Sequence, residues 1–299
     1  MAGRRCTARY TGACNACRGG RQVRALIFSL ILAVPVAVLA YLLFWPAVRR
    51  WRRRRLRARP PPADLDAVLA RTISLYAFLP DDLRQQLHGH VNVFLAEKKF
   101  IGAGGQEIDD EIRFTVAGTA CILLLNREPS YFPGFRSILI YPDTYQAIDE
   151  RYDGVVKTEK RSVRAGESWH RGPIVLSWGD VIRGGADPAD GFNVVLHEFA
   201  HKLDEENAGT DGLPTLHEAE HFKEWVEVLT REYEALRERV RRRRNRVLDA
   251  YGLTSPPEFF AVATESFFEK SKAMQKRLPD LYEQLRRFYR VDPASWRRR

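Results

Sequence analysis

The pentapeptide His197-Glu198-Phe199-Ala200-His201 decides the fold and the chemistry expected of this 299-residue chain. Two histidines four residues apart lie one turn apart on the same face of a helix, so both imidazoles can bind one metal ion. Glu198 stands beside the first histidine, where a carboxylate can accept a proton from the attacking water of a hydrolase. The pattern predicts a catalytic zinc site.

The residues around this motif predict that it lies on a helix. Asp190 and Asn193 are candidate N-caps, and no proline occurs in residues 190–208. Apolar side chains recur at helical spacing on both sides of the motif, at Phe192, Val195, Leu196, Phe199 and Leu203. A chance occurrence of the five-residue pattern is the alternative. We expect a buried helix.

A catalytic zinc ion needs a third protein ligand, and Glu258 is the best candidate downstream. Residues 255–265 have the pattern of a second helix start, with Ser255 as N-cap and prolines in the first turn. Glu258 then shares a helix face with Glu265. The spacing from Ser255 to Glu258 also fits a capping box, in which the carboxylate binds a backbone amide. The residues alone leave both roles of Glu258 open.

A second pair of histidines four residues apart, His217 and His221, lies in a highly charged segment. We interpret this pair as solvated rather than metal-binding. The same segment contains a basic run, residues 237–246, which we expect to be the basic end of a long solvated helix. Contact of this run with anionic lipid is the alternative.

Several separated motifs give the chain a resemblance to the Mlc titration factor A family. The resemblance extends from about Leu65 to Arg290 and leaves roughly the first sixty residues uncovered. The motifs that carry it are Gly172-Pro-Ile-Val-Leu-Ser-Trp178, Gly191-Phe-Asn-Val-Val-Leu-His197-Glu-Phe-Ala-His201-Lys-Leu-Asp204, Gly209 with Gly212-Leu-Pro214, Tyr251, and Glu258-Phe-Phe-Ala-Val-Ala-Thr-Glu265-Ser-Phe-Phe.

This resemblance implies a zinc-dependent metallopeptidase of the gluzincin type, with a site similar to that of the anthrax lethal factor protease domain. Residue by residue, it implies that His197, His201 and Glu258 bind one Zn²⁺ ion per chain. It further implies that Glu198 is the general base and that Tyr251 stabilises the oxyanion. The implied activity is hydrolysis of a peptide or protein substrate, with aminopeptidase-like action.

Two further acids are candidates for holding a ligand imidazole in place. Asp204 follows His201 by three residues on the same helical face, and its carboxylate could accept a hydrogen bond from an imidazole. Glu265 could orient His197 or His201 in the same way. The alternatives are a surface acid at the end of the helix for Asp204 and a solvated helix residue for Glu265.

An apolar segment near the N-terminus predicts a membrane anchor. Residues 25–48 contain no charged side chain. This stretch is long enough to cross a bilayer as a helix. Phe44, Trp45 and Trp51 at its C-terminal end suit a membrane interface. A cleavable signal peptide is the alternative because residues 38–40 resemble a cleavage site, but the apolar run continues beyond them. We predict a single-pass transmembrane helix.

Arginines on the two sides of this helix predict its orientation. Eight lie within residues 49–59 and six precede residue 25, which favours a cytoplasmic C-terminal side. The predicted location is therefore the inner membrane, with the catalytic domain in the cytoplasm. Residues 1–24 are rich in Gly, Arg and Cys, and we treat them as a doubtful or disordered leader, with a translation start expected near Val23.

The net charge of +10 does not indicate a nucleic-acid-binding protein. Fourteen of the 48 basic residues precede Pro60, where there is no acidic residue, so the remainder holds 34 basic and 38 acidic side chains. A mildly acidic domain gives no reason to expect direct nucleic-acid binding. Cys121 alone among the four cysteines lies in this domain, which excludes an intradomain disulfide and fits a reducing compartment.

We expect four segments along the chain: the leader 1–24, the anchor 25–48, an Arg- and Pro-rich linker 49–64, and a zinc peptidase domain 65–299. The predicted fold class is α+β, with one transmembrane helix before a mainly helical, zincin-like domain that has a small sheet.

Within the domain, the pattern predicts helices over residues 83–94 and 112–125 and short strands over 136–141 and 173–178, with helices dominating from 190 to 289. By analogy with zinc peptidases, the strand over 173–178 is the expected edge strand for an extended substrate.

Two classes of function remain at this point. The first is a membrane-anchored zinc peptidase. The second is a regulatory binding protein without catalysis, because the family includes a factor that sequesters the transcriptional repressor Mlc. Glu198 favours the enzyme, since a binding protein needs no base beside a metal ligand.

Overall fold

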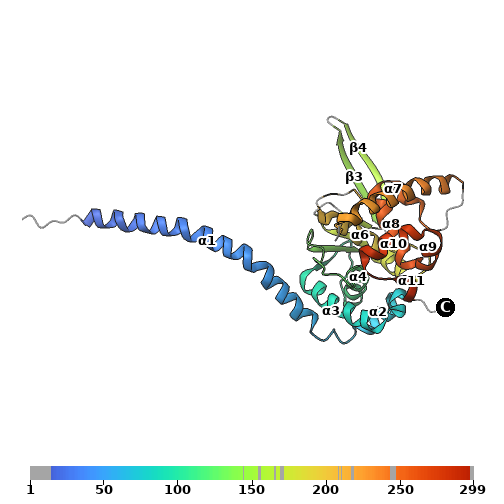
Figure 1. Cartoon of the computed structure of the whole chain (residues 1–299), viewed down its shortest axis with the longest axis horizontal. Helices are drawn as coiled ribbons and strands as arrows, with labels where there is room; N and C mark the ends of the chain where they lie inside the picture. Colours follow the sequence, from blue (N-terminus) through green and yellow to red (C-terminus); the bar gives the residue numbers. More distant parts are fainter. Residues whose placement is uncertain are drawn as a thin grey trace, which may run out of the picture. The chain divides into compact units, whose positions relative to one another are not determined.

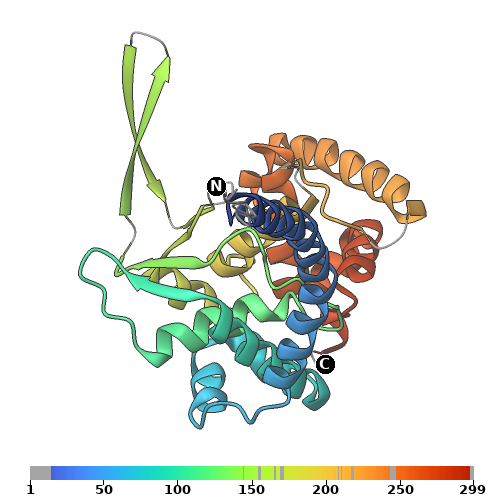
Figure 2. The ribbon, with the colours of Figure 1, turned by 90° about the vertical axis from the view of Figure 1, so that its left-hand side faces the viewer.

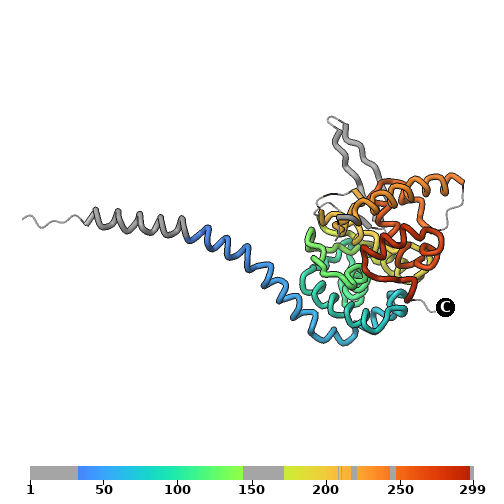
Figure 3. Tube along the Cα trace, viewed as in Figure 1, coloured from blue at the N-terminus to red at the C-terminus, as the bar shows by residue number. Residues whose placement is uncertain are grey.

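The fold is described from a computed structural model of the whole chain. Its backbone is described for residues 15–143, 145–153, 156–164, 166–168, 172–207, 209, 211–216, 219–242 and 247–296. Side chains are described for 33–143, 172–207, 209, 211–216, 221–242 and 247–296 (Figure 3). The chain divides into two compact units, Met1–Arg55 and Leu56–Arg299.

The first long helix, α1 (Asn15–Arg57), contains the apolar segment (Figure 1). Its part Ala33–Arg57 has 25 residues and contains an 18-residue window with a mean hydropathy of 1.3, enough to cross a membrane by length and composition. Helices with these properties occur as membrane spans and as signal sequences. The predicted apolar helix is therefore confirmed, and it continues as helix through the arginine cluster that we expected in the linker.

The main sheet has three parallel strands and one antiparallel edge strand. Its order is β1 (Lys99–Gly102), β2 (Ser137–Tyr141), β6 (Ile174–Ser177) and β5 (Gly166–Ser168), and β5 alone runs antiparallel to its neighbour. The two predicted strands are present as β2 and β6. However, β6 lies between β2 and β5, so the prediction that residues 173–178 form the edge was wrong. The edge strand beside β6 is β5.

A separate hairpin pairs β3 (Tyr145–Asp153) with β4 (Val156–Arg164) over nine residues of each strand. Sequence analysis did not anticipate this hairpin because its strands are polar and lack a continuous apolar face. The dipeptide Asp153-Gly154, which favours the tight turns of hairpins, was the available signal.

Helices form most of the remaining domain, and the predicted helices over 83–94 and 112–125 are confirmed as α3 and α4, which pack against each other (Figure 2). The helices are α2 (Leu65–Thr72), η1 (Ser74–Phe78), α3 (Asp81–Glu97), α4 (Asp110–Ile122), α5 (Trp178–Ala186), α6 (Val194–Asp204), η2 (Glu205–Asn207), α7 (Ala219–Arg241), η3 (Ala250–Leu253), α8 (Pro256–Glu269), α9 (Ser271–Arg277), α10 (Pro279–Tyr289) and α11 (Pro293–Trp296).

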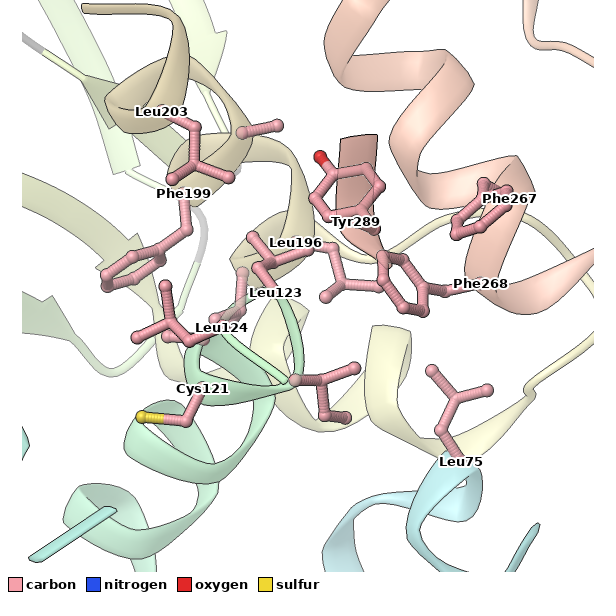
Figure 4. Close-up of a cluster of buried hydrophobic side chains, with 14 of the residues drawn as sticks. Leu75, Cys121, Leu123, Leu124, Leu196, Phe199, Leu203, Phe267, Phe268 and Tyr289 are labelled. Carbon is pink, nitrogen blue, oxygen red and sulfur yellow. The ribbon is translucent and has the colours of Figure 1, made fainter. Parts of the chain in front are cut away.

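Helix α6 is held in the core by its apolar face. Leu196, Phe199 and Leu203 point into a cluster of buried side chains (Figure 4). The Phe199 ring lies 4.9 Å from that of Phe132 and 5.7 Å from that of Phe94, measured between ring centroids. Burial of this face fixes the helix, so its opposite side can present polar groups at defined positions.

Candidate metal centre

Asn193 begins the helix that carries the two histidines. Its side-chain oxygen accepts a hydrogen bond from the backbone N–H of Leu196 (3.1 Å), so it is the N-cap of α6. Of the two candidate caps, Asp190 instead accepts a hydrogen bond from the N–H of Phe192 in the preceding turn. From this start, His197 and His201 lie one turn apart on the same side of α6, as the motif predicts.

The start of α8 decides between the two roles that the sequence left open for Glu258. Ser255 caps the helix by accepting a hydrogen bond from the N–H of Glu258 (3.4 Å), as predicted. The Glu258 carboxylate does not complete a capping box. It reaches across to α6, where its Oε2 atom lies 2.9 Å from Nε2 of His197 and 3.4 Å from Nε2 of His201.

These three side chains form a set of donors that fits one metal ion. The two histidine Nε2 atoms are 3.2 Å apart, so the three donor atoms form a triangle with edges of 2.9, 3.2 and 3.4 Å. Ligand atoms around a tetrahedral zinc ion, at bond lengths of about 2.0–2.1 Å, are about 3.3 Å apart. Two imidazoles and a carboxylate therefore converge at the spacing that a divalent cation requires.

Glu198 lies beside this triangle and is 5 % exposed. Its Oε2 atom is buried and has no hydrogen-bond partner among the described residues. Burial raises the pKa of Glu198, while the two neighbouring imidazoles act in the opposite direction. A buried carboxylate oxygen without a protein partner at this position is suited to bind a water molecule or a substrate group.

Glu265 contacts the His197 imidazole at Nδ1, the ring nitrogen that does not face Glu258. Its Oε1 atom lies 2.7 Å from Nδ1 of His197, while its Oε2 accepts a hydrogen bond from the backbone N–H of Asn193 (2.6 Å). Burial opposes protonation of His197, but the carboxylates of Glu265 and Glu258 outweigh it and raise the pKa of the ring well above its usual value. In the neutral ring that binds a metal, Nδ1 donates a hydrogen bond to Glu265 and the Nε2 lone pair faces the ligand atoms of His201 and Glu258.

Burial acts to raise the pKa of Glu258, but the two imidazoles together outweigh it, through hydrogen bonds and charge, and lower the pKa to about 2. The same arrangement of lone pairs and negative charge that attracts protons here also attracts a divalent cation.

Asp204 is buried at 1 % exposure, so the alternative of a surface acid was wrong. Its Oδ2 atom accepts a hydrogen bond from the N–H of Gly212 (2.9 Å), and no hydrogen bond joins it to either imidazole among the described residues. Burial raises its pKa to about 6. Gly212 has a positive φ of 78°, and a Cβ there would lie 2.7 Å from the carbonyl oxygen of Pro256. Asp204 thus ties the end of α6 to a loop that touches the start of α8.

Tyr251 lies at the entrance to the site on η3. Its ring centroid is 5.9 Å from that of His197, and 53 % of the residue is exposed. The structure thus brings Tyr251 close to the metal centre, with about half of the residue exposed to solvent.

The second histidine pair does not form a solvated unit as predicted. His221 is 4 % exposed, and its ring packs against Trp225 one turn later on α7. The cause is that α7 is amphipathic and His221 lies on its buried face. His217 and residues 243–246 of the basic run lie outside the described residues.

Sequence analysis missed Glu269, which is 1 % exposed and accepts a hydrogen bond from the Asn193 side chain (3.0 Å). The signal was present, because Glu265 and Glu269 are two acids one turn apart in an otherwise apolar helix.

Comparison with known proteins agrees with this geometry. Residues 48–290 match the model of a family described as glucose-regulated metallo-peptidase M90. An uncharacterized protein of Synechocystis is 36 % identical over 267 residues, which cover 89 % of this chain and 97 % of the relative. Mlc titration factor A of Cronobacter sakazakii is 33 % identical over 83 % of this chain and 92 % of its own length. That of Edwardsiella ictaluri is 34 % identical over 84 % and 94 %. The predicted resemblance is confirmed, and the chain belongs to the M90 family of metallo-peptidases.

Proposed function

We propose that the chain is a membrane-anchored zinc peptidase in which His197, His201 and Glu258 bind the ion. The observation that carries this proposal is the triangle of donor atoms, with edges of 2.9, 3.2 and 3.4 Å, beside the buried and unpartnered oxygen of Glu198. A structural zinc site would be closed by a fourth protein ligand and would need no base beside it.

When bound, zinc polarises the scissile carbonyl group and makes water more acidic. Glu198 accepts the proton of the attacking water and delivers it to the leaving amine, which is a role for a carboxylate within hydrogen-bond reach of both. Tyr251 donates a hydrogen bond to the oxyanion that develops on the carbonyl. Glu265 keeps the His197 ring in the tautomer that presents Nε2 to the metal.

An extended substrate would bind along β5, the edge strand beside β6. Among the described strands β5 is the outer one of the sheet, so its outer edge can offer backbone hydrogen-bonding groups, and β5 contacts α6. Aminopeptidase-like action is the form of hydrolysis that we propose. Peptides with a free N-terminus should then be cleaved faster than the same peptides with an acetylated N-terminus.

The segment Ala33–Arg57 supports the anchor, and the arginines within residues 49–59 support a cytoplasmic domain. Anchoring at the inner membrane would restrict the peptidase to substrates near the cytoplasmic face. The domain boundaries that we propose are those at residues 24, 48 and 64.

Substitution of the base tests the proposal most directly. Full-length protein in detergent should contain about one zinc ion per chain. Glu198→Gln should retain this zinc and the fold but lose roughly a hundredfold or more in peptide hydrolysis. Glu258→Ala should lower the zinc content, because it removes one of three protein ligands. Full activity of Glu198→Gln would contradict the proposed mechanism.

A second function is favoured by the relatives that are named Mlc titration factor A. We propose as an alternative that this chain sequesters a transcriptional repressor of the Mlc type. Size-exclusion chromatography of the purified chain with such a repressor should then give a complex. Complex formation by Glu198→Gln at unchanged affinity would separate this function from catalysis.

A further inference from the structure

Asn193 links three elements of the fold behind the metal site. Its side-chain amide donates to the carbonyl oxygen of Gly184 on α5 (3.2 Å) and to Oε1 of Glu269 on α8 (3.0 Å). Its backbone N–H donates to Glu265, and its side-chain oxygen caps α6 at Leu196. Four hydrogen bonds of one residue, which is 3 % exposed, therefore join α5, α6 and α8.

The two carboxyl groups in this network have different surroundings. Glu265 faces two groups, the Asn193 N–H (2.6 Å) and Nδ1 of the His197 ring (2.7 Å). Glu269 follows one turn later, is buried at 1 % exposure, and also lies near the carboxylate of Asp190. Burial raises the pKa of Glu269 to about 9, and the neighbouring acids act in the same direction, so at neutral pH its carboxyl group is uncharged.

We propose that Asn193 and Glu269 form a positioning pair for the metal centre, with Glu269 as the acceptor that fixes Asn193 and Asn193 as the donor that fixes Glu265 against His197. This inference rests on the proposed zinc site and extends it beyond the side chains that touch the ligands. Asn193 is far more constrained than a helix cap requires, because a cap uses its side-chain oxygen alone.

The backbone N–H, the side-chain oxygen and the side-chain amide of Asn193 have separable roles. Serine caps helices about as well as asparagine, but its side chain is too short to reach Glu269 or Gly184. Asn193→Ser therefore keeps the cap and the backbone N–H bond to Glu265 while it removes the side-chain hydrogen bonds to Glu269 and Gly184. Glu269→Met keeps the volume and removes the acceptor, whereas Glu269→Gln keeps an uncharged acceptor for Asn193.

The test compares zinc affinity in the full-length protein, measured by competition with a chromophoric chelator. Loss of groups that orient a ligand typically costs about 10–100-fold in metal affinity, and we expect about tenfold for Asn193→Ser and for Glu269→Met. Glu269→Gln should recover most of the affinity lost in Glu269→Met. Ser177→Ala is the matched control, because it removes the buried N-cap of α5 (3.2 Å to the N–H of Asp180) at a distance in sequence from the metal ligands.

A second readout excludes a purely structural effect. Cobalt in place of zinc gives absorption bands that depend on ligand geometry, so these bands should shift in Asn193→Ser and remain unchanged in Ser177→Ala. Thermal unfolding well above the assay temperature establishes that each variant is folded. Wild-type affinity and an unchanged cobalt spectrum in both Asn193→Ser and Glu269→Met would overturn the positioning pair while the zinc site stands. Absence of zinc binding by the wild type would overturn the proposed function itself, and the positioning pair with it.

Discussion

Replacement of Glu269 by glutamine should make the stability of the protein depend less on pH. The carboxyl group has an ordinary pKa of 4.5 and a pKa of about 9 in the fold, where burial is the main cause of the increase. Between these two pH values the folded state binds one more proton than the unfolded state. The folded pKa is the higher one, so this contribution to stability is complete below pH 4.5 and is lost as the pH rises towards 9.

The size of the effect follows from the same two values. Each pH unit within the window lowers the free energy of unfolding by about 1.4 kcal/mol. From pH 5 to pH 8 the wild type should therefore lose about 4 kcal/mol relative to Glu269→Gln, which cannot ionise. For a domain of this size the difference corresponds to a relative shift in Tm of about 8–16 °C.

Thermal unfolding of both full-length proteins at pH 5, 6, 7 and 8 measures this difference. A chelator in every sample removes the contribution of bound metal, which itself depends on pH. Subtraction of the two curves cancels the titration of all other groups. Parallel curves for the wild type and Glu269→Gln would refute the reasoning, because they would mean that Glu269 has the same pKa in the folded and unfolded states.

Three further outcomes are expected. Tyr251→Phe should lower kcat on the order of a hundredfold with a smaller change in KM, since its hydrogen bond forms with the oxyanion; an unchanged kcat would exclude this role. Phe199→Ala should cost about 3–5 kcal/mol in unfolding experiments because its ring is fully buried, whereas Phe222→Ala, at 49 % exposure, should cost little. A periplasm-dependent phosphatase fused after Arg299 should be inactive, whereas a cytoplasm-dependent fluorescent reporter fused there should be active. Neutral replacements of the arginines in 49–59 should weaken the preference for a cytoplasmic C-terminal side.

The sequence predicted well both α6, the helix that carries His197 and His201, and the first turn of α8, because local signals mark both. Asn193 and Ser255 are N-caps that satisfy free amides in the first turn, and the prolines after Ser255 fit the first turn of a helix. The role of Glu258 could not be derived in this way. A capping box and a metal ligand use the same spacing, and the position of α6, which decides between them, is a property of tertiary packing.

The strand order and the burial of some side chains depend on which segments pack together in the fold. The spacing of residues along the sequence does not contain this information. The strand β6 was correctly located, but its central position follows from pairing with β5, a three-residue strand too short to give a periodic signal. His221 was expected in solvent because the residues around it are charged, and a surface position was the alternative for Asp204. Both residues are buried, since the helix face on which each lies is covered by other segments of the chain.

The metal centre joins residues that are made at different times. His197 and Glu258 are 61 positions apart, with the whole of α7 between them. At a synthesis rate of about 5–20 residues per second, Glu258 follows His197 out of the ribosome by about 3–12 s. Two imidazoles alone bind a cation weakly, so the nascent chain cannot assemble its metal site until α8 has been made. Helix α1 is synthesised before α6 and α8, so the membrane anchoring that we propose for it can begin before the proposed zinc site is complete.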